Sequence, residues 1–326
     1  MPCYYPITAY NISQETGKFE LVFSVNKAME HGFPRPISLP CQKCIGCRLD
    51  YSRQWANRCM LELQYHKSSY FVTLTYDDEH LPRTYSADPE TGEIVSPVAT
   101  LVKSDFQKFM KRLRKNTGQK VRFMAAGEYG SNTCRPHYHA IIFGLQLDDL
   151  VEYKHSRLGY QYYNSETITK CWSDSFGQSI GFAVVGAVTW DTCAYVARYV
   201  MKKAMGPTPL FSCEGANLAP EFSLMSRRPG LARQYYDDHP ELWEYDKINI
   251  STPSGGRSFY PPRYYERLFD IDNPDASLER RLKKAHFAMK LPSQKTRLTD
   301  ISYFDILKKE ENLRVKRLKS LRRDLI

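Results

Sequence analysis

The chain has 326 residues, which is enough for one large domain or two smaller ones, and its formal net charge is +10. No run of 18 apolar residues occurs, which excludes a transmembrane helix, and the first residues lack the basic and apolar regions of a signal peptide. Because there is no secretion signal and the nine cysteines are an odd number, the sequence predicts a protein of a reducing cytoplasm.

The positive charge is concentrated at the end of the sequence. Residues 277–326 contain 15 Lys and Arg against 6 Asp and Glu, an excess that accounts for nearly all of the net charge. Such a tail is typical of electrostatic attachment to a polyanion. The alternative is a solvated helix with one charged face.

The first 68 residues predict an N-terminal extension. Residues 1–40 are rich in Pro and aromatic residues and contain weak strands such as residues 19–25. A Cys-x2-Cys-x2-Cys motif at residues 41–47 leads into a helix that we expect at about residues 48–67.

A strand and a basic amphipathic helix come next. The alternating run SYFVTLTY at residues 69–76 predicts the strand, and residues 83–99 predict a loop. In the helix that follows, Ser104 is the expected N-cap and Gly118 the expected terminator. Its apolar face is formed by Phe106, Phe109, Met110 and Leu113, and its other face carries Lys108, Lys111, Arg112, Arg114 and Lys115.

The centre of the chain predicts a hairpin followed by a strand and a helix. Residues 120–130 and 137–145 are two strands joined too tightly for a parallel crossover. Residues 182–188 predict a further strand, and residues 191–204 a helix that Thr189 or Asp191 caps. This order indicates an α+β domain with an antiparallel sheet at residues 69–206.

The remaining third predicts two further segments. Residues 207–276 are rich in Pro, Gly, Ser and aromatics and predict an irregular segment that wraps the domain. Residues 277–326 predict a basic tail of two helices, broken at LPSQK, residues 291–295.

Two histidines open the second strand of the hairpin, HYHAIIF. His137 and His139 project on the same side of a strand, roughly 7 Å apart along the backbone. Glu128 ends the preceding strand just across the turn. Two His and one carboxylate leave positions open for water or substrate, which suits a catalytic metal. The alternative is a pair of solvated histidines at a strand edge.

The helix at residues 191–204 adds candidate nucleophiles. At 100° per residue, Tyr195, Tyr199 and Lys202 lie roughly opposite its apolar stripe. A tyrosine becomes a nucleophile when a cation or metal lowers the cost of the phenolate. The alternative is that both tyrosines pack on another element.

This ordered set resembles the HUH endonucleases, the rolling-circle replication initiators. The resemblance rests on the FVTLTY strand, Glu128 nine residues before His137, the His-x-His strand and Tyr-x-x-x-Tyr, and covers residues 40–205. Within that group, residues 40–59 and GEYG…RPHYHAIIFG are similar to the two-tyrosine initiators of gokushovirus-type microviruses.

The resemblance implies an RNA-recognition-like antiparallel sheet of about five strands flanked by helices. It also implies that Glu128, His137 and His139 bind Mg²⁺ or Mn²⁺, and that Tyr195 and Tyr199 are nucleophiles. We expect Lys202 to steady the phenolate or phosphate charge; the alternative is a solvated lysine at the end of the helix. One tyrosine would cut a circular phage genome at its origin, forming a 5′-phosphotyrosine, and the strand would be rejoined after synthesis. The expected setting is the cytoplasm of a bacterial host.

Partners follow from the same comparison. Origin DNA would be bound as a single strand, by stacking on aromatics and by phosphate contacts from the tail and from Lys108, Lys111, Arg112, Lys115 and Arg135. No G-x-x-x-x-G-K-[ST] motif occurs, so strand separation and synthesis would need a host helicase and DNA polymerase. We expect no membrane partner.

The cysteine motif has two interpretations. With Cys59, Cys41, Cys44 and Cys47 would form a four-cysteine zinc site, although the spacing is unusually tight; otherwise the thiols are free. The fourth position of a ferredoxin motif falls at Tyr51, which excludes that cluster.

Two other functions compete with replication initiation. One is a plasmid or transposon nuclease of the relaxase type, although relaxases usually place the tyrosine ahead of the histidines. The other is a non-enzymatic, zinc-dependent nucleic-acid-binding protein, in which the histidines have no catalytic role.

Overall fold

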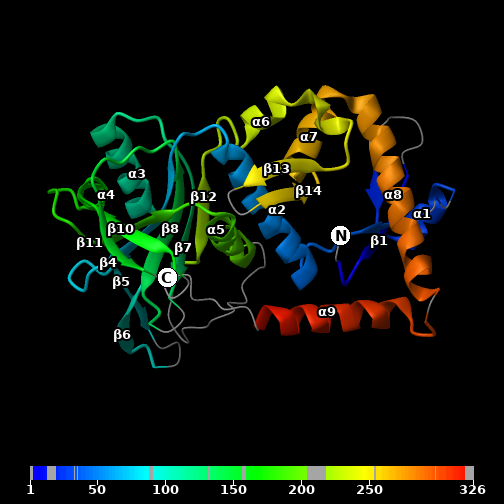
Figure 1. Cartoon of the computed structure of the whole chain (residues 1–326). Coiled ribbons are helices and arrows are strands. Elements are labelled where there is room, and N and C mark those ends of the chain that lie inside the picture. Colours follow the sequence, from blue (N-terminus) through cyan, green and yellow to red (C-terminus); the bar gives the residue numbers. More distant parts are fainter. Residues whose placement is uncertain are drawn as a thin grey trace. The chain divides into compact units, whose positions relative to one another are not determined.

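The computed structural model describes residues 3–12, 20–32, 34, 36–87, 91–130, 133–155, 159–203, 218–252, 255–297 and 299–319, with the backbone alone at 94–96, 198–203 and 319. The chain forms two compact units (Figure 1). The smaller unit comprises Met1–Gln54 and Glu241–Arg322, and the larger one is built mainly from Trp55–Pro240.

A seven-stranded antiparallel sheet forms the centre of the larger unit. Its strand order is β12-β7-β8-β4-β11-β10-β9, and every pairing is antiparallel. The strands are β4 (Ser69–Tyr76), β7 (Arg122–Tyr129), β8 (Pro136–Phe143), β9 (Leu150–His155), β10 (Gln161–Ser165), β11 (Gly181–Ala187) and β12 (Phe222–Met225). The predicted α+β class is therefore confirmed, with seven strands in the described residues rather than about five.

Helices cover both faces of this sheet. Helices α3 (Lys103–Thr117) and α4 (Glu166–Cys171) share one apolar core with alternate residues of β8, namely Tyr138, Ala140 and Ile142. Helix α5 (Trp190–Lys203) contacts β7, β8 and β12 on the opposite face. The His137 side of β8 therefore faces α5 and not the larger core.

The start of α3 corrects one prediction. The helix begins at Lys103 with Val102 as its N-cap, and Ser104 lies within the first turn. The hydroxyl of Tyr138 is 3.0 Å from both the N–H and the carbonyl oxygen of Val102. A core tyrosine thus fixes the backbone of the N-cap residue, which makes no side-chain cap of its own. Gly118 ends the helix with φ 67°, as the sequence predicts.

Two stretches predicted as irregular contain regular structure. The expected loop at 83–99 is a hairpin of β5 (Arg83–Ala87) and β6 (Ile94–Ala99). Described residues between 218 and 275 form β12, α6 (Arg233–Asp238), η1 (Pro240–Trp243), β13 (Ile248–Thr252), β14 (Gly255–Phe259) and α7 (Arg263–Asp272). Polar β-strands and short helices carry weak periodicity, which explains why the sequence missed them.

The smaller unit combines a small sheet with long helices. The sheet has the order β2-β1-β3, from β1 (Ile7–Asn11), β2 (Leu21–Val22) and β3 (Pro36–Leu39). Helix α1 (Val25–Glu30) is short, and α2 (Ile45–Leu63) continues into the larger unit.

The basic tail forms two helices, α8 (Pro274–Thr296) and α9 (Tyr303–Lys319). The predicted break at 291–295 is wrong, because α8 continues through Pro292 and ends at Thr296, and α9 begins at Tyr303. Lys295 of α8 pairs with Glu310 of α9 at 2.5 Å. None of the helices in the described part of the chain is apolar over a length that would span a bilayer.

The junction of β4 and β11 yields a stability prediction. Gly181 has φ +154°, and an added Cβ would lie 2.0 Å from the carbonyl oxygen of Thr75. That oxygen is held in place by the indole N–H of Trp172 at 2.8 Å. We expect Gly181→Ala to lower the free energy of unfolding by about 2–4 kcal/mol, measured by urea denaturation.

Gly118→Ala is the matched control, since Gly118 also has positive φ but nothing lies within 4 Å of its added Cβ. It should cost only the backbone strain, about 1–2 kcal/mol. Equal losses for the two variants would contradict the packing argument.

Candidate functional site

Three potential metal ligands meet on adjacent strands of the large sheet. The register of β7 and β8 pairs Glu128 directly with His137 and Ala126 with His139. Both histidine Nε2 atoms lie 2.9 Å from Glu128 Oε1. One ligand atom from each residue lies within 4.8 Å of the others, so the structure brings the three predicted ligands together.

The other ring nitrogens of the histidines contact fixed partners. His137 Nδ1 is 3.1 Å from the carbonyl oxygen of Arg135, which can only accept, so this nitrogen carries the hydrogen. His139 Nδ1 is 3.0 Å from Thr73 Oγ1 on β4. Such contacts orient an imidazole so that Nε2 points at a metal. Thr73 was not recognised in the sequence, although it lies in the predicted strand at 69–76.

Burial sets the charges of the group. Complete burial lowers the pKa of His139, which favours the neutral ring. Burial alone would raise the pKa of Glu128, but the hydrogen bonds with His137 and His139 outweigh it and hold that pKa well below its usual range. An ionised carboxylate beside a neutral imidazole is the protonation state that a divalent cation requires.

This donor set fits a catalytic rather than a structural metal. Two imidazole nitrogens and one carboxylate are three protein ligands, which leave coordination positions for substrate or water. The set also suits several divalent ions, since imidazole and carboxylate are ligands of intermediate and hard character.

Tyr195 of α5 points at this group. Its hydroxyl donates to Glu128 Oε1 at 3.2 Å and lies 3.5 Å from His139 Nε2. Its ring meets His139 edge-on at 5.1 Å and Phe71 edge-on at 6.3 Å, while Phe71 stacks on His139 at 5.6 Å. The tyrosine oxygen is thereby held beside the candidate metal ligands.

The start of α5 positions this tyrosine. Thr189 and Thr192 exchange hydrogen bonds between hydroxyl and backbone N–H, at 2.8 and 3.2 Å. Of the two predicted caps, Thr189 and Asp191, this reciprocal arrangement identifies Thr189 as the N-cap. The backbone of α5 includes residues 199 and 202, but the side chains of Tyr199 and Lys202 lie outside the described residues.

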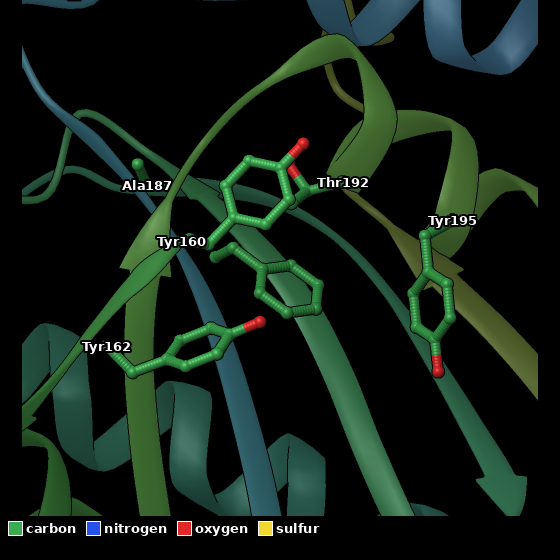
Figure 2. A pocket seen from close by; sticks show the side chains of 6 residues that line it. Tyr160, Tyr162, Ala187, Thr192 and Tyr195 are labelled. Atoms are coloured by element: carbon green, nitrogen blue, oxygen red, sulfur yellow. The ribbon is translucent and has the colours of Figure 1, made fainter. Parts of the chain in front are cut away.

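An aromatic pocket adjoins the tyrosine (Figure 2). It is lined by Phe71, Tyr160, Tyr162, Ala187, Thr192 and Tyr195. Figure 2 shows Tyr162 and Tyr195 on opposite sides of the pocket. The sequence did not single out this pocket, because its residues come from β4, β10, the residue before β10, β11 and α5.

The predicted DNA-contacting residues lie in two places. Lys108, Lys111, Arg112 and Lys115 are on α3, across the sheet from the histidines, and Arg112 donates to the carbonyl oxygen of Asp174 at 2.9 Å. Arg135 directly precedes β8 and donates to the carbonyl oxygen of Tyr76 at 2.9 Å and to Asp78. Of these five residues, only Arg135 is a near sequence neighbour of a candidate ligand, His137.

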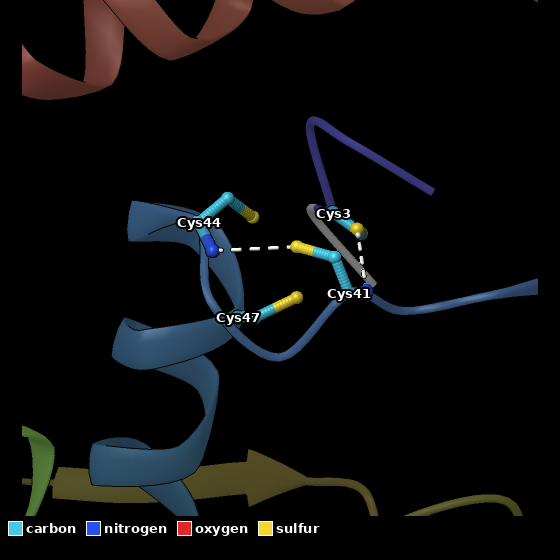
Figure 3. A group of neighbouring side chains, drawn as sticks. All are labelled: Cys3, Cys41, Cys44 and Cys47. Carbon is cyan, nitrogen blue, oxygen red and sulfur yellow. Dashed lines mark hydrogen bonds between the residues drawn. The ribbon is translucent and has the colours of Figure 1, made fainter. Parts of the chain in front are cut away.

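A second group of potential metal ligands contains Cys3, Cys41, Cys44 and Cys47 (Figure 3). The prediction that Cys59 is the fourth ligand is wrong, because Cys3 takes that place in the group. Cys59 is buried in the larger unit, 3.2 Å from Met124 Sδ. Twelve residues of α2 separate Cys47 from Cys59, a rise of about 18 Å, so the two cannot share one ion.

Comparison with known proteins identifies relatives in viruses. The profile of the replication-associated protein ORF2/G2P family matches residues 69–204. The replication-associated protein ORF2 of Spiroplasma virus 4 is 33% identical over 280 residues, 84% of this chain and 82% of that protein. The replication-associated protein VP4 of Bdellovibrio phage phiMH2K is 30% identical over 282 residues, 82% of this chain and 80% of that protein.

A third relative is the replication-associated protein ORF4 of Chlamydia phage 1. It is 31% identical over 270 residues, 77% of this chain and 61% of that protein. No solved structure matches the chain.

The contact between Thr73 and His139 yields a prediction about metal affinity. Thr73→Val removes the hydrogen-bond partner of His139 Nδ1, which helps to orient the ring. We expect Mn²⁺ binding, measured by titration calorimetry, to weaken about 10- to 100-fold.

Thr75→Val is the control from the same strand. Thr75 pairs with His137, but its hydroxyl is directed to the carbonyl oxygen of Phe182 at 3.4 Å. This variant should bind Mn²⁺ as the wild type does. An equal loss in both variants would mean that the hydroxyl of Thr73 does not orient the ligand.

Proposed function

Because the chain belongs to the replication-associated protein ORF2/G2P family, we propose that it is a metal-dependent nuclease that nicks a circular phage genome at its origin and later rejoins the strand. The observation that carries this proposal is the position of Tyr195, whose hydroxyl lies 3.2 Å from Glu128 within the candidate metal ligands. The names of the relatives, which are replication-associated proteins, support the biological setting.

In the proposed cleavage, the oxygen of Tyr195 attacks phosphorus of a single DNA strand. A bond forms between this oxygen and phosphorus, and the bond from phosphorus to the 3′ oxygen breaks. The tyrosine loses its proton and the departing 3′ oxygen gains one, which leaves a 5′-phosphotyrosine and a free 3′-OH. A host polymerase extends that 3′ end.

A divalent ion on Glu128, His137 and His139 would polarise the phosphate and lower the cost of the phenolate. The two imidazoles favour Mn²⁺ over Mg²⁺ chemically, although availability in the cell also decides between them. The hydrogen bond from Tyr195 to Glu128 keeps the phenol oxygen oriented toward this group before substrate binds.

Rejoining uses the energy kept in the covalent intermediate. A second cut by Tyr199, one turn along α5, would free a 3′-OH that attacks the first phosphotyrosine. The phosphodiester bond re-forms and the tyrosine recovers its proton, so no ATP is consumed. Lys202 would balance the charge of the phenolate or the phosphate.

The rim of the aromatic pocket offers a stacking surface for a nucleobase of the same strand. Unpaired bases bind proteins by stacking on aromatic rings, and the partly exposed ring of Tyr160 lies at the rim of this pocket, above the buried rings of Phe71 and Tyr162. A base held there would place the neighbouring phosphate close to the tyrosine oxygen. Separation of the strands remains a task for a host helicase, since the chain has no P-loop motif.

A covalent adduct tests the proposed function directly. Wild-type protein incubated with single-stranded origin DNA and Mn²⁺ should give a band on denaturing gels that migrates as protein joined to DNA. Tyr195→Phe should reduce this adduct at least tenfold in a single-turnover assay, and the double change with Tyr199→Phe should abolish it.

Tyr153→Phe is the matched control, since Tyr153 lies exposed on β9 outside the pocket. Mass spectrometry of the adduct identifies the modified tyrosine. Adduct formation by the double variant would refute the assignment of the nucleophiles. No adduct from the wild type would favour a non-enzymatic binding protein.

The pocket gives an independent prediction about DNA affinity. Tyr160→Ala removes one stacking surface at the mouth of the pocket. We expect the affinity for a short single-stranded DNA to fall by about 1–3 kcal/mol, roughly 5- to 150-fold, measured by fluorescence anisotropy. Tyr153→Ala should change it little, and equal losses would place the base elsewhere.

A further inference from the structure

Four cysteines of the smaller unit come together through a pairing of distant strands. The register of β1 and β3 pairs Ile7 with Leu39 and Thr8 with Ser38 in antiparallel fashion. The chain just before β1 therefore runs beside the chain just after β3, which brings Cys3 next to Cys41. Cys44 and Cys47 follow at the start of α2, where Figure 3 shows all four sulfurs converging.

The sulfur positions fit one tetrahedral ion. All four Sγ atoms lie within 4.8 Å of one another. A zinc–sulfur bond of about 2.3 Å places tetrahedral sulfurs about 3.8 Å apart, so a small contraction of the group completes the site. An iron–sulfur cluster, which holds several metal atoms, would need sulfurs spread more widely around it.

Backbone N–H groups already point at three of the sulfurs. Cys41 N–H donates to Cys3 Sγ at 3.2 Å, Cys44 N–H to Cys41 Sγ at 3.3 Å, and Tyr4 N–H to Cys44 Sγ at 3.4 Å. Gln42, between the first two cysteines of the motif, has φ +60°, which makes the tight turn that aims both inward. Such N–H bonds stabilise thiolate ligands of a metal.

The segment that carries Cys3 also supports helix α9. Tyr4 and Leu307 are almost fully buried against Cys44 and Cys47. Tyr5 donates to Glu311 Oε2 at 2.7 Å, and its ring meets Phe304 edge-on at 6.3 Å. The contacts of α9 with the N-terminal segment thus depend on the position of residues 3–5.

We propose that Cys3, Cys41, Cys44 and Cys47 bind one zinc ion, and that this ion fixes the N-terminal segment on which α9 packs. Four protein thiolates close the coordination sphere, so the ion has a structural role. Because α9 exposes Lys308, Lys309 and Lys316, the ion also fixes the position of a basic surface of the smaller unit. The proposal is independent of the nuclease chemistry, which uses residues of the larger unit.

Metal content tests the first half of the proposal. The double change His137→Ala and His139→Ala removes the other candidate site. The purified full-length protein with this change should contain one zinc per chain, measured by inductively coupled plasma mass spectrometry. Adding Cys3→Ala should lower zinc below about 0.2 per chain, and Cys3→His, which restores a ligand, should recover it. In wild-type protein, Co²⁺ should give the absorption bands of a tetrahedral tetrathiolate.

Cys59→Ala separates this site from the one that the sequence predicts, and it should leave zinc content unchanged. The proposal would be overturned if the Cys59→Ala variant lost its zinc and the Cys3→Ala variant kept it. Wild-type protein without bound zinc and without the Co²⁺ bands would overturn it as well.

Limited proteolysis tests the second half. Chelation of the zinc should speed tryptic cleavage after Lys308 and Lys309 at least tenfold, because α9 loses its support. Cleavage after Lys111, on α3 of the larger unit, should keep its rate and serves as the internal control. Equal rates at Lys308 with and without zinc would show that the ion does not fix α9.

Discussion

The candidate site depends on the register of one hairpin. A slip of one residue between β7 and β8 would turn Glu128 away from His137, because alternate side chains of a strand point to opposite faces. The register is held from the other side of the sheet, where Tyr138, Ala140 and Ile142 are fully buried in the core with α3. The hydrophobic core thus positions ligands that it does not contact.

The same pairing explains the charge of the group. Since His137 Nδ1 donates to the carbonyl oxygen of Arg135, Nε2 is the nitrogen that can bind a metal, and it lies 2.9 Å from Glu128 Oε1. A buried carboxylate at this position needs a positive charge beside it. The donor set suits a cation at this position, and the hydrogen bond from Tyr195 adds one more donor to the same oxygen.

Elements determined by neighbouring residues were predicted from the sequence, whereas features that depend on contacts between distant segments were missed. The strand at 69–76, the hairpin and the helix at 191–204 follow from periodicity and turn residues within short windows, and with them come Glu128, His137 and His139. Cys3 and the aromatic pocket depend on pairings between distant segments, which one sequence does not reveal. Cys59 is a different case, since the predicted helix already placed it about 18 Å from Cys47.

The two candidate metal groups differ in the number of their ligands and in the segments that supply them. The Glu–His–His group takes three ligands from adjacent strands, which would leave coordination positions unfilled, and Tyr195 of α5 approaches it. The four-cysteine group draws ligands from segments 38 residues apart, and its four thiolates would fill the coordination sphere of one ion. An open site permits substrate to reach the ion, whereas a closed one replaces part of a hydrophobic core. The small three-stranded sheet of the smaller unit is the kind of structure that needs such support.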